Sequence, residues 1–221
     1  MFPENTLPAA YFGKVDGPGG RSERWTVWLK PEIYFLRVEY REKAGSSTED
    51  VIGRWDPVAD RAAIRFHRDG RESIAFDVPH PDTLRFRGAV GRRRSGPPER
   101  LVRASSTAYI EPRVYLTGYV FYFGGLPYFE DCGTAWKLPL LLEGDFRRAL
   151  RNLDASRAQY PRLLVTVDGR IVRRPGFDGV PREWLIIERF GRAMPGGACA
   201  DTSYLAERDR LERLTASGVG Q

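Results

Sequence analysis

The sequence contains two cysteines, and their thiols can take part in more kinds of chemistry than any other side chain in it. Cys132 lies in the stretch YFEDCGTAW, between acidic residues and a glycine and with aromatic residues on both sides, whereas Cys199 lies in MPGGACAD. A pair of thiols can bind a metal, supply a nucleophile, form a disulfide or pack as small apolar groups. The residues near each sulfur decide among these chemistries.

The partners that a metal site or a nucleophilic thiol needs are missing near both cysteines. Zinc and copper sites use three or four Cys, His or carboxylate ligands, often with pairs at short spacing, and each cysteine here is solitary. A nucleophilic cysteine needs a base, usually histidine, but His67 and His80 both fall in the first half of the chain. We therefore expect neither role, and two interpretations stay open: a disulfide between Cys132 and Cys199, or two separate buried thiols.

Neighbouring carboxylates are the other candidates for chemistry, because a pair of them can act as acid and base in a hydrolase. The pairs are Glu49–Asp50, Glu130–Asp131 and Glu143 with Asp145. Adjacent residues on a strand point to opposite faces, so we expect none of these pairs to be catalytic. The sequence also has no G-x-S-x-G, Walker loop, H-E-x-x-H or dinucleotide fingerprint. We predict a protein that is not an enzyme, with no catalytic residue and no cofactor.

Alternating apolar residues predict strands throughout the first half. Tyr34, Leu36 and Val38 share one face of a strand, and Phe35 and Arg37 lie on the other. Short strand-like runs follow at regular spacing, with turn sequences such as PVADR, DG and PHPD between them. This pattern predicts a small β-barrel over residues 6–104.

The second half predicts strands, one helix and then further strands. The run EGDFRRALRNLDASRAQY has helical spacing, with Phe146, Leu150 and Leu153 on one face. It is followed by RLLVTVDGRIVRRPG, in which Asp-Gly predicts a turn, and by EWLIIERFGRAM. We predict an OB-like barrel of five strands over residues 105–203, and a short helix with a flexible tail over residues 204–221. The fold class is all-β with one or two short helices.

Aromatic residues are concentrated in VYLTGYVFYFGGLPYFED. Tyr119, Phe121 and Phe123 alternate with Val120 and Tyr122, which we interpret as an inward face that fills the barrel or a domain interface. OB-folds also stack nucleobases on aromatic residues within basic grooves, but no positive stripe accompanies these rings. We therefore predict no nucleic-acid partner.

Charge and hydropathy support the same exclusions. The net charge is +6 and the pI about 9.5, but basic and acidic residues are interleaved and the only dense run is Arg92-Arg93-Arg94, as on a solvated surface. No apolar run approaches the ~20 residues that a membrane-spanning helix requires.

The order of motifs in the second half is distinctive. GYVFYFGGLPYFEDCGTAWKLPL is followed by EGDFRRALRNL, LLVTVDGRIVRRPG, LIIERF and MPGGACAD. Over residues 114–201 this order resembles the C-terminal domain of NlpE-type envelope lipoproteins, a family associated with copper resistance and envelope-stress signalling. The shared features are an aromatic strand with an F-x-x-C-x-T core, a helix, an LLVTVEGRI-like strand and a final P…C. The resemblance implies a Cys132–Cys199 disulfide, and with it an oxidising compartment.

The first half has the opening order of the same family, in LPAAYFGKVDGPGGRSERWTVWLKPEIYFLRVEY followed by GRW. Where the family carries C-x-x-C, this chain reads VDGPGGR from Val15 to Arg21. The copper or redox chemistry of that pair is therefore not carried over. Soft metals select thiolate ligands, so we expect no copper or zinc site in the first domain and expect His67 and His80 to be solvated.

The resemblance favours a non-enzymatic envelope protein, located in the periplasm or cell envelope. Its implied role is a structural, sensing or partner-binding module in envelope stress or metal homeostasis, with an envelope or periplasmic protein as partner. Membrane association would require a lipid anchor that this chain does not carry, and we expect an export signal upstream of Leu7 in the full gene product. Two alternatives are a lipocalin-like binder of a small ligand or metal and an OB-type nucleic-acid-binding protein.

Overall fold

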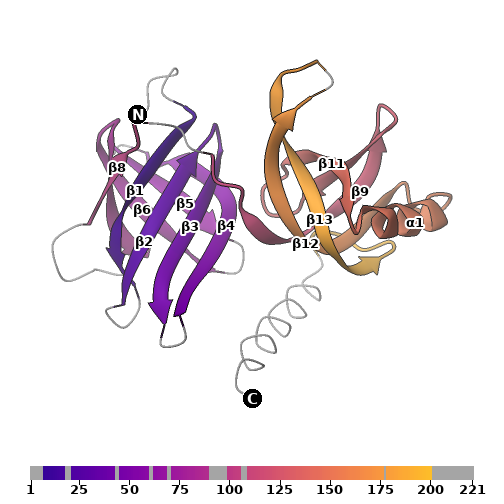
Figure 1. Cartoon of the computed structure of the whole chain (residues 1–221), viewed down its shortest axis with the longest axis horizontal. Helices are drawn as coiled ribbons and strands as arrows, with labels where there is room; N and C mark the ends of the chain where they lie inside the picture. The colour runs from indigo at the N-terminus through magenta and orange to yellow at the C-terminus, as the bar shows by residue number, and fades with distance from the viewer. Residues whose placement is uncertain are drawn as a thin grey trace.

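The computed structural model consists of two closed β-barrels that lie side by side (Figure 1). It describes residues 7–17, 21–42, 45–59, 62–68, 71–89, 99–105, 109–176 and 178–200. The helix and tail predicted over residues 204–221 lie outside the described residues, as does the run Arg92-Arg93-Arg94. Among the helices that are described, none is long and apolar enough to span a bilayer.

The first barrel is formed by eight antiparallel strands that pair in the order of the sequence. Tyr11 and Phe12 of the first strand pair with Arg103 and Val102 of the last, which closes the wall. The strands are β1 (Ala9–Asp16), β2 (Ser22–Leu29), β3 (Ile33–Glu42), β4 (Gly45–Pro57), β5 (Ala63–Arg68), β6 (Arg71–His80), β7 (Thr83–Ala89) and β8 (Arg100–Arg103).

Aromatic side chains fill the interior of the first barrel. Tyr34 stacks on Phe66 with ring centroids 4.0 Å apart, and Phe66 contacts Phe76 at 4.9 Å. Phe76 in turn contacts Phe86 at 5.5 Å, and Trp25 contacts Phe86 at 4.9 Å. An eight-stranded barrel is just wide enough for side chains to fill it. These rings occupy the space in which a lipocalin-like cup would hold a ligand.

The second barrel has five strands in the closed order β10-β11-β13-β12-β9. Strands β11 and β13 pair in parallel, and the helix α1 connects β11 to β12. This arrangement confirms the predicted five-stranded OB-like barrel. Its elements are β9 (Arg113–Phe123), β10 (Leu126–Asp131), β11 (Lys137–Gly144), α1 (Phe146–Ser156), β12 (Arg162–Pro175) and β13 (Pro181–Met194).

Helix α1 lies on the side of the second barrel that faces away from the first (Figure 1). It buries Phe146, Ala149 and Leu153 against the barrel, which is the apolar face that the spacing predicts. Asp145 precedes the helix but makes no side-chain cap bond to it. Its carboxylate instead accepts a hydrogen bond from the backbone N–H of Phe190 at 3.0 Å, which attaches the start of the helix to β13.

The Asp-Gly pair in RLLVTVDGRIVRRPG is not a turn, and this prediction was wrong. Asp168 and Gly169 lie inside the single long strand β12, where the register with β13 shifts. A Cβ atom at Gly169 would lie 2.6 Å from Cδ1 of Leu185. The glycine therefore permits a close approach of the strands at a bulge, which bends the strand around the small barrel.

Tyr119, Phe121 and Phe123 of β9 point outward, contrary to the expectation that they fill the barrel, whereas Tyr122 lies on the face of Val120 and packs against the core. Val120 is fully buried, whereas Phe123 is 69% exposed and Tyr119 and Phe121 are half-buried. The alternation correctly separates the two faces, but it does not say which face is inside. A barrel of five strands has a narrow interior, and it is occupied chiefly by Val and Leu side chains together with the ring of Phe129.

Candidate functional site at the junction of the two barrels

The junction between the barrels has an apolar centre built from outward-facing residues of the first barrel. Trp28 and Phe35 alternate with the core residues of β2 and β3, yet they are only 1% and 0% exposed. The Trp28 ring lies 4.4 Å from that of Tyr109, which is in the connection between the barrels, and the Phe35 ring lies 5.7 Å from that of Trp136. The second barrel therefore covers rings that a lone first barrel would expose to water.

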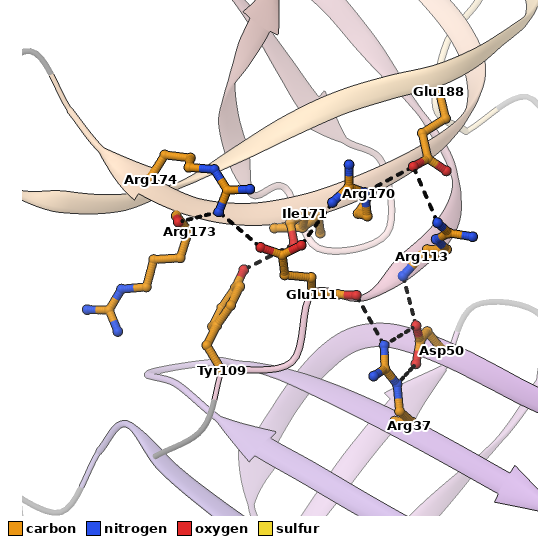
Figure 2. A network of polar contacts seen from close by, with 10 residues as sticks. All are labelled: Arg37, Asp50, Tyr109, Glu111, Arg113, Arg170, Ile171, Arg173, Arg174 and Glu188. Atoms are coloured by element: carbon orange, nitrogen blue, oxygen red, sulfur yellow. Dashed lines mark hydrogen bonds and ion pairs between the residues drawn. The ribbon is translucent and has the colours of Figure 1, made fainter. Parts of the chain in front are cut away.

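A carboxylate of the first barrel is the centre of the polar part of the junction. Asp50 accepts two hydrogen bonds from the guanidinium of Arg37, at 2.7 and 2.9 Å, and one from the backbone N–H of Arg113 at 2.8 Å (Figure 2). Arg37 also donates to the carbonyl oxygen of Glu111 at 3.1 Å. The hydrogen bond to Asp50 raises the pKa of Arg37 above its ordinary value, against the opposing effect of burial. The ion pair of Arg37 and Asp50, called the charged clamp below, therefore holds the start of β9.

Glu111 extends this network to the second barrel. Its two carboxylate oxygens lie 2.9 Å from Arg170 and 3.1 Å from Arg174 (Figure 2). Arg170 also pairs with Glu188 at 3.0 Å, and the hydrogen bond to Glu188 is the largest cause of the raised pKa of Arg170. The connection between the barrels is therefore bonded on both sides.

Tyr109 combines the apolar and polar parts of the junction. Its ring packs on Trp28, and its hydroxyl donates to the carbonyl oxygen of Ile171 at 3.4 Å (Figure 2). Burial raises the pKa of Tyr109 far above its ordinary value, and the negative charges of Glu183 and Glu111 raise it further. The phenol is therefore neutral at physiological pH and acts as a hydrogen-bond donor, not as a base.

A second ion pair joins the barrels on the other side of the apolar centre. Nζ of Lys30 lies 2.7 Å from the carboxylate of Glu183, with both side chains mostly buried. The same ammonium group lies 4.7 Å from the centroid of the Trp136 ring, within the range of a cation–π interaction. The junction therefore combines apolar contacts between rings with ion pairs.

A cavity of about 380 Å³ lies beside the junction. The first barrel contributes Arg54, Asp56 and His67 to its walls, and the second contributes Gly133 and Thr134. The imidazole of His67 is in close contact with the carboxylate of Asp56. Both polar groups are therefore already engaged with each other.

The two cysteines form a disulfide, as the family resemblance implies. The Cα atoms of Cys132 and Cys199 are 5.4 Å apart, and the bond spans 67 residues of sequence. The backbone N–H of Cys132 donates to the carbonyl oxygen of Thr117 at 2.9 Å. The hydroxyl of Tyr119 accepts from the N–H of Cys199 at 3.2 Å. The disulfide thus holds the end of the second barrel against β9 and β10.

The acidic pairs of the sequence have separate structural contacts. Glu130 forms an ion pair with Arg162 at 2.5 Å. Asp131 is buried and accepts from the N–H and hydroxyl of Thr134, at 2.8 and 2.7 Å, which fixes the turn that contains Cys132. Asp50 lies at the junction, and Glu49 precedes it in β4, opposite Val38. Asp145 precedes α1 and bonds to Phe190 of β13, and Glu143 is exposed.

The histidines lie at exposed positions of the first barrel. His67 contacts Asp56, and Nδ1 of His80 accepts from the N–H of Asp82 at 3.3 Å. No group of three or more His, Cys, Asp or Glu side chains that could hold a metal occurs within the part of the chain that is described. The absence of a copper or zinc site in the first domain stays a prediction.

A buried glutamate lies next to the segment in which the family carries C-x-x-C. Glu23 is 4% exposed, and its two carboxylate oxygens accept from Arg21 and from the indole N–H of Trp25, each at 2.8 Å. Both oxygens of this carboxylate are therefore occupied.

Sequence reasoning missed most of the junction. The segment that connects the barrels was interpreted only as a boundary, at residues 104 and 105, and that boundary falls between β8 and β9. The signal that could have revealed the junction is Ile33 and Phe35, two apolar residues on the strand face that continues with Arg37 and Glu39.

No protein-family model and no curated protein matches the chain. A solved structure similar to it is the crystal structure of the Cpx pathway activator NlpE from Escherichia coli. The sequence identity is 16%, the match covers 88% of this chain and 100% of that chain, and the TM-score is 0.37.

Proposed function

We propose that this chain is a non-enzymatic protein of the bacterial cell envelope, in which two barrels are joined into a single partner-binding unit. The observation that carries the proposal is the Cys132–Cys199 disulfide. Disulfides persist in oxidising compartments such as the periplasm and are rare in the reducing cytosol. The bond connects two distant parts of one small barrel, which is the arrangement of a structural crosslink.

The polar groups at the junction are paired with one another, which supports a binding role for the chain. The carboxylates of Asp50, Glu111 and Glu188 are each neutralised by at least one arginine, and the phenol of Tyr109 is held neutral by burial. These groups hold the two barrels together. The interior of the first barrel is packed with rings, so a ligand or partner has the outer surfaces available.

Envelope-stress signalling or metal homeostasis is the biological role that the NlpE-type resemblance adds to this proposal. The partner in that role would be an envelope or periplasmic protein. A lipid anchor on a longer form of the chain would place the barrels at a membrane surface.

Fractionation of the native host tests the proposed location. Cells are separated into envelope, periplasmic and cytosolic fractions, each verified with a marker enzyme, and the chain is detected with an antibody. We expect the chain in the periplasmic or envelope fraction. Recovery with the cytosolic marker would contradict the proposal.

A further inference from the structure

The outer face of the second barrel carries a row of rings across neighbouring strands. Phe121 of β9 is paired with Arg162 of β12 on one side and with Tyr128 of β10 on the other. Tyr128 is in turn paired with Pro139 of β11. Because paired residues on a sheet share a face, these four side chains form a continuous strip.

The rings of this strip contact one another and remain open to solvent. The Tyr128 ring lies 6.2 Å from that of Phe121 and 5.8 Å from that of Phe123. Phe123 is 69% exposed and Leu126, across the turn, is 38% exposed. Isolated exposed apolar residues are common, but a contiguous set of exposed aromatic residues indicates an interaction surface.

A groove of about 400 Å³ continues the strip from Tyr128 onward, which is within the size range of small-molecule sites. It lies over the second and third strands of the barrel and beside the turn between its last two strands. These are the elements with which OB-folds bind oligonucleotides and oligosaccharides. The groove is lined chiefly by Tyr128, Trp136, Lys137, Pro139, Val180 and Arg182.

Cations lie at both ends of the combined strip and groove. Lys137 is exposed in the groove and has no ion pair among the residues that the structure describes. Arg182, 44% exposed, pairs with the exposed Asp178 across the turn. At the far end the guanidinium of Arg162 lies 4.4 Å from the Tyr119 ring and 5.0 Å from the Phe121 ring.

The acidic residues of this region are already neutralised. Glu130 pairs with Arg162, and Glu183 pairs with Lys30. These pairings neutralise Arg162 and Arg182 as well, so Lys137 carries the charge without an acidic partner among the described residues of this surface. An elongated ligand with an acidic group complements an aromatic floor with this cation beside it.

We propose that the strip and groove bind an anionic oligosaccharide. The flat C–H faces of pyranose rings pack on Tyr128 and the neighbouring phenyl rings, while Lys137 pairs with an acidic group of the sugar. The choice of a sugar over a nucleic acid rests on the proposed envelope location, where glycans are accessible and nucleic acids are not. The size of the groove accommodates one or two sugar units, and the strip extends the site to further units.

Calorimetric titration of the purified, oxidised chain at low ionic strength tests this proposal. The probes are a hexamer of galacturonate, a neutral cellohexaose and an oligothymidylate of eight nucleotides. We expect the galacturonate hexamer to bind at least tenfold more tightly than cellohexaose, and to lose affinity as salt is added because salt screens exposed charges.

Two variants place the ligand on this surface, and a third is a control for charge. Tyr128→Ala and Lys137→Glu should each weaken the binding of the galacturonate hexamer about tenfold, the size of one lost stacking or ionic contact of about 1.4 kcal/mol. Arg147→Glu makes the same charge change on an exposed residue of α1, which lines neither the groove nor the strip, and should leave the affinity within twofold. Circular dichroism and the absence of free thiols verify the fold of each variant.

The outcomes separate this inference from the proposed function. No binding of the galacturonate hexamer, or an equal loss with Arg147→Glu, overturns the site. Tighter binding of the oligothymidylate, with loss in Tyr128→Ala, overturns the ligand class. Each measurement uses purified protein, so a cytosolic location would contradict the proposed function without altering these affinities.

Discussion

The two barrels differ in how many aromatic side chains they hold inside their walls. The first places Trp25, Phe66, Phe76 and Phe86 in its interior, where they pack ring against ring. The second buries Phe129 among smaller side chains such as Val120, and carries Phe121, Phe123 and Tyr128 on its outer face. The number of strands sets the radius of a closed barrel. Eight strands therefore admit a series of rings packed on one another, whereas five leave room for fewer rings among aliphatic side chains.

The outward rings of the two barrels also differ in what covers them. Trp28 and Phe35 of the first barrel are buried because the second barrel lies over them. Phe123 and Leu126 of the second barrel have no such cover from the rest of the described chain and are exposed. The first barrel thus uses its outer rings for assembly, and the second has rings available for a ligand.

Removing a covered ring should have the largest effect on this comparison. Trp28→Ala creates a cavity at the junction, and we expect a loss of about 3–5 kcal/mol in the free energy of unfolding. Calorimetry should show one transition for the parent and two for the variant, because the barrels lose their shared core. Phe12→Ala, at a position that is 48% exposed on the wall of the same barrel, is the control and should change stability by less than about 0.5 kcal/mol. Equal losses in the two variants would show that the barrels do not depend on the covered rings.

Removing the disulfide should affect the second barrel more than the first. The double variant Cys132→Ser with Cys199→Ser frees a loop of 67 residues, and the chain-entropy model gives a loss of about 4 kcal/mol. Hydrogen exchange should show a larger acceleration in β9 to β13 than in β1 to β8. Reduction of the parent protein is the matched control and should give the same pattern. Equal acceleration in both barrels would contradict a crosslink with a local role.

Weakening the charged clamp should lower the free energy of unfolding by less than Trp28→Ala or removal of the disulfide. Asp50→Asn keeps the shape of the side chain but leaves the guanidinium of Arg37 without its counter-charge, so we expect a loss of about 1.5–3 kcal/mol. Chemical denaturation measures it. The matched control is Asp178→Asn, which removes an aspartate paired with Arg182 on the exposed turn and should have no measurable effect. Equal stabilities of the two variants would show that the polar network at the junction does not stabilise the protein.

The smallest expected effect is a loss of stability at alkaline pH that arises from Tyr109 at the junction. The pKa of Tyr109 is raised by burial from its ordinary value of 10.0, so its contribution to stability is complete below pH 10 and is lost as pH rises toward the folded value. Tyr109→Phe should lessen this loss of stability, measured by denaturation on both sides of pH 10. Tyr11, whose pKa burial raises to about 12, remains in the variant and accounts for a residual slope in the same direction. An unchanged slope in the variant would show that Tyr109 is not protected in the junction.

The sequence predicted local features well because their causes are local. The alternation of Tyr34, Leu36 and Val38 placed them in the core, and the spacing of Phe146 and Leu153 placed them on the buried face of α1. The two-barrel fold class followed from the number of strands and the position of the helix.

The features that could not be predicted depend on closure and on contacts between distant segments. Alternation in β9 does not reveal which face is inside, so the ring of Phe121 was assigned to the wrong side. Asp168-Gly169 has the composition of a turn, but the pairing of β12 along β13 continues through it. The clamp at the junction joins Asp50 to Arg113, which are 63 residues apart, and no spacing rule relates them.

The oxidation state of the two cysteines in living cells tests the central claim most directly. Cells of the native host are quenched in acid, the proteins are denatured and treated with a maleimide, and the mass of the chain is measured before and after reduction. The account predicts no label on Cys132 or Cys199 without reductant and two labels after it, because the disulfide of a protein at the proposed envelope location would already be formed. Two labels without reductant would show that the native chain holds free thiols, and would contradict its assignment to the cell envelope.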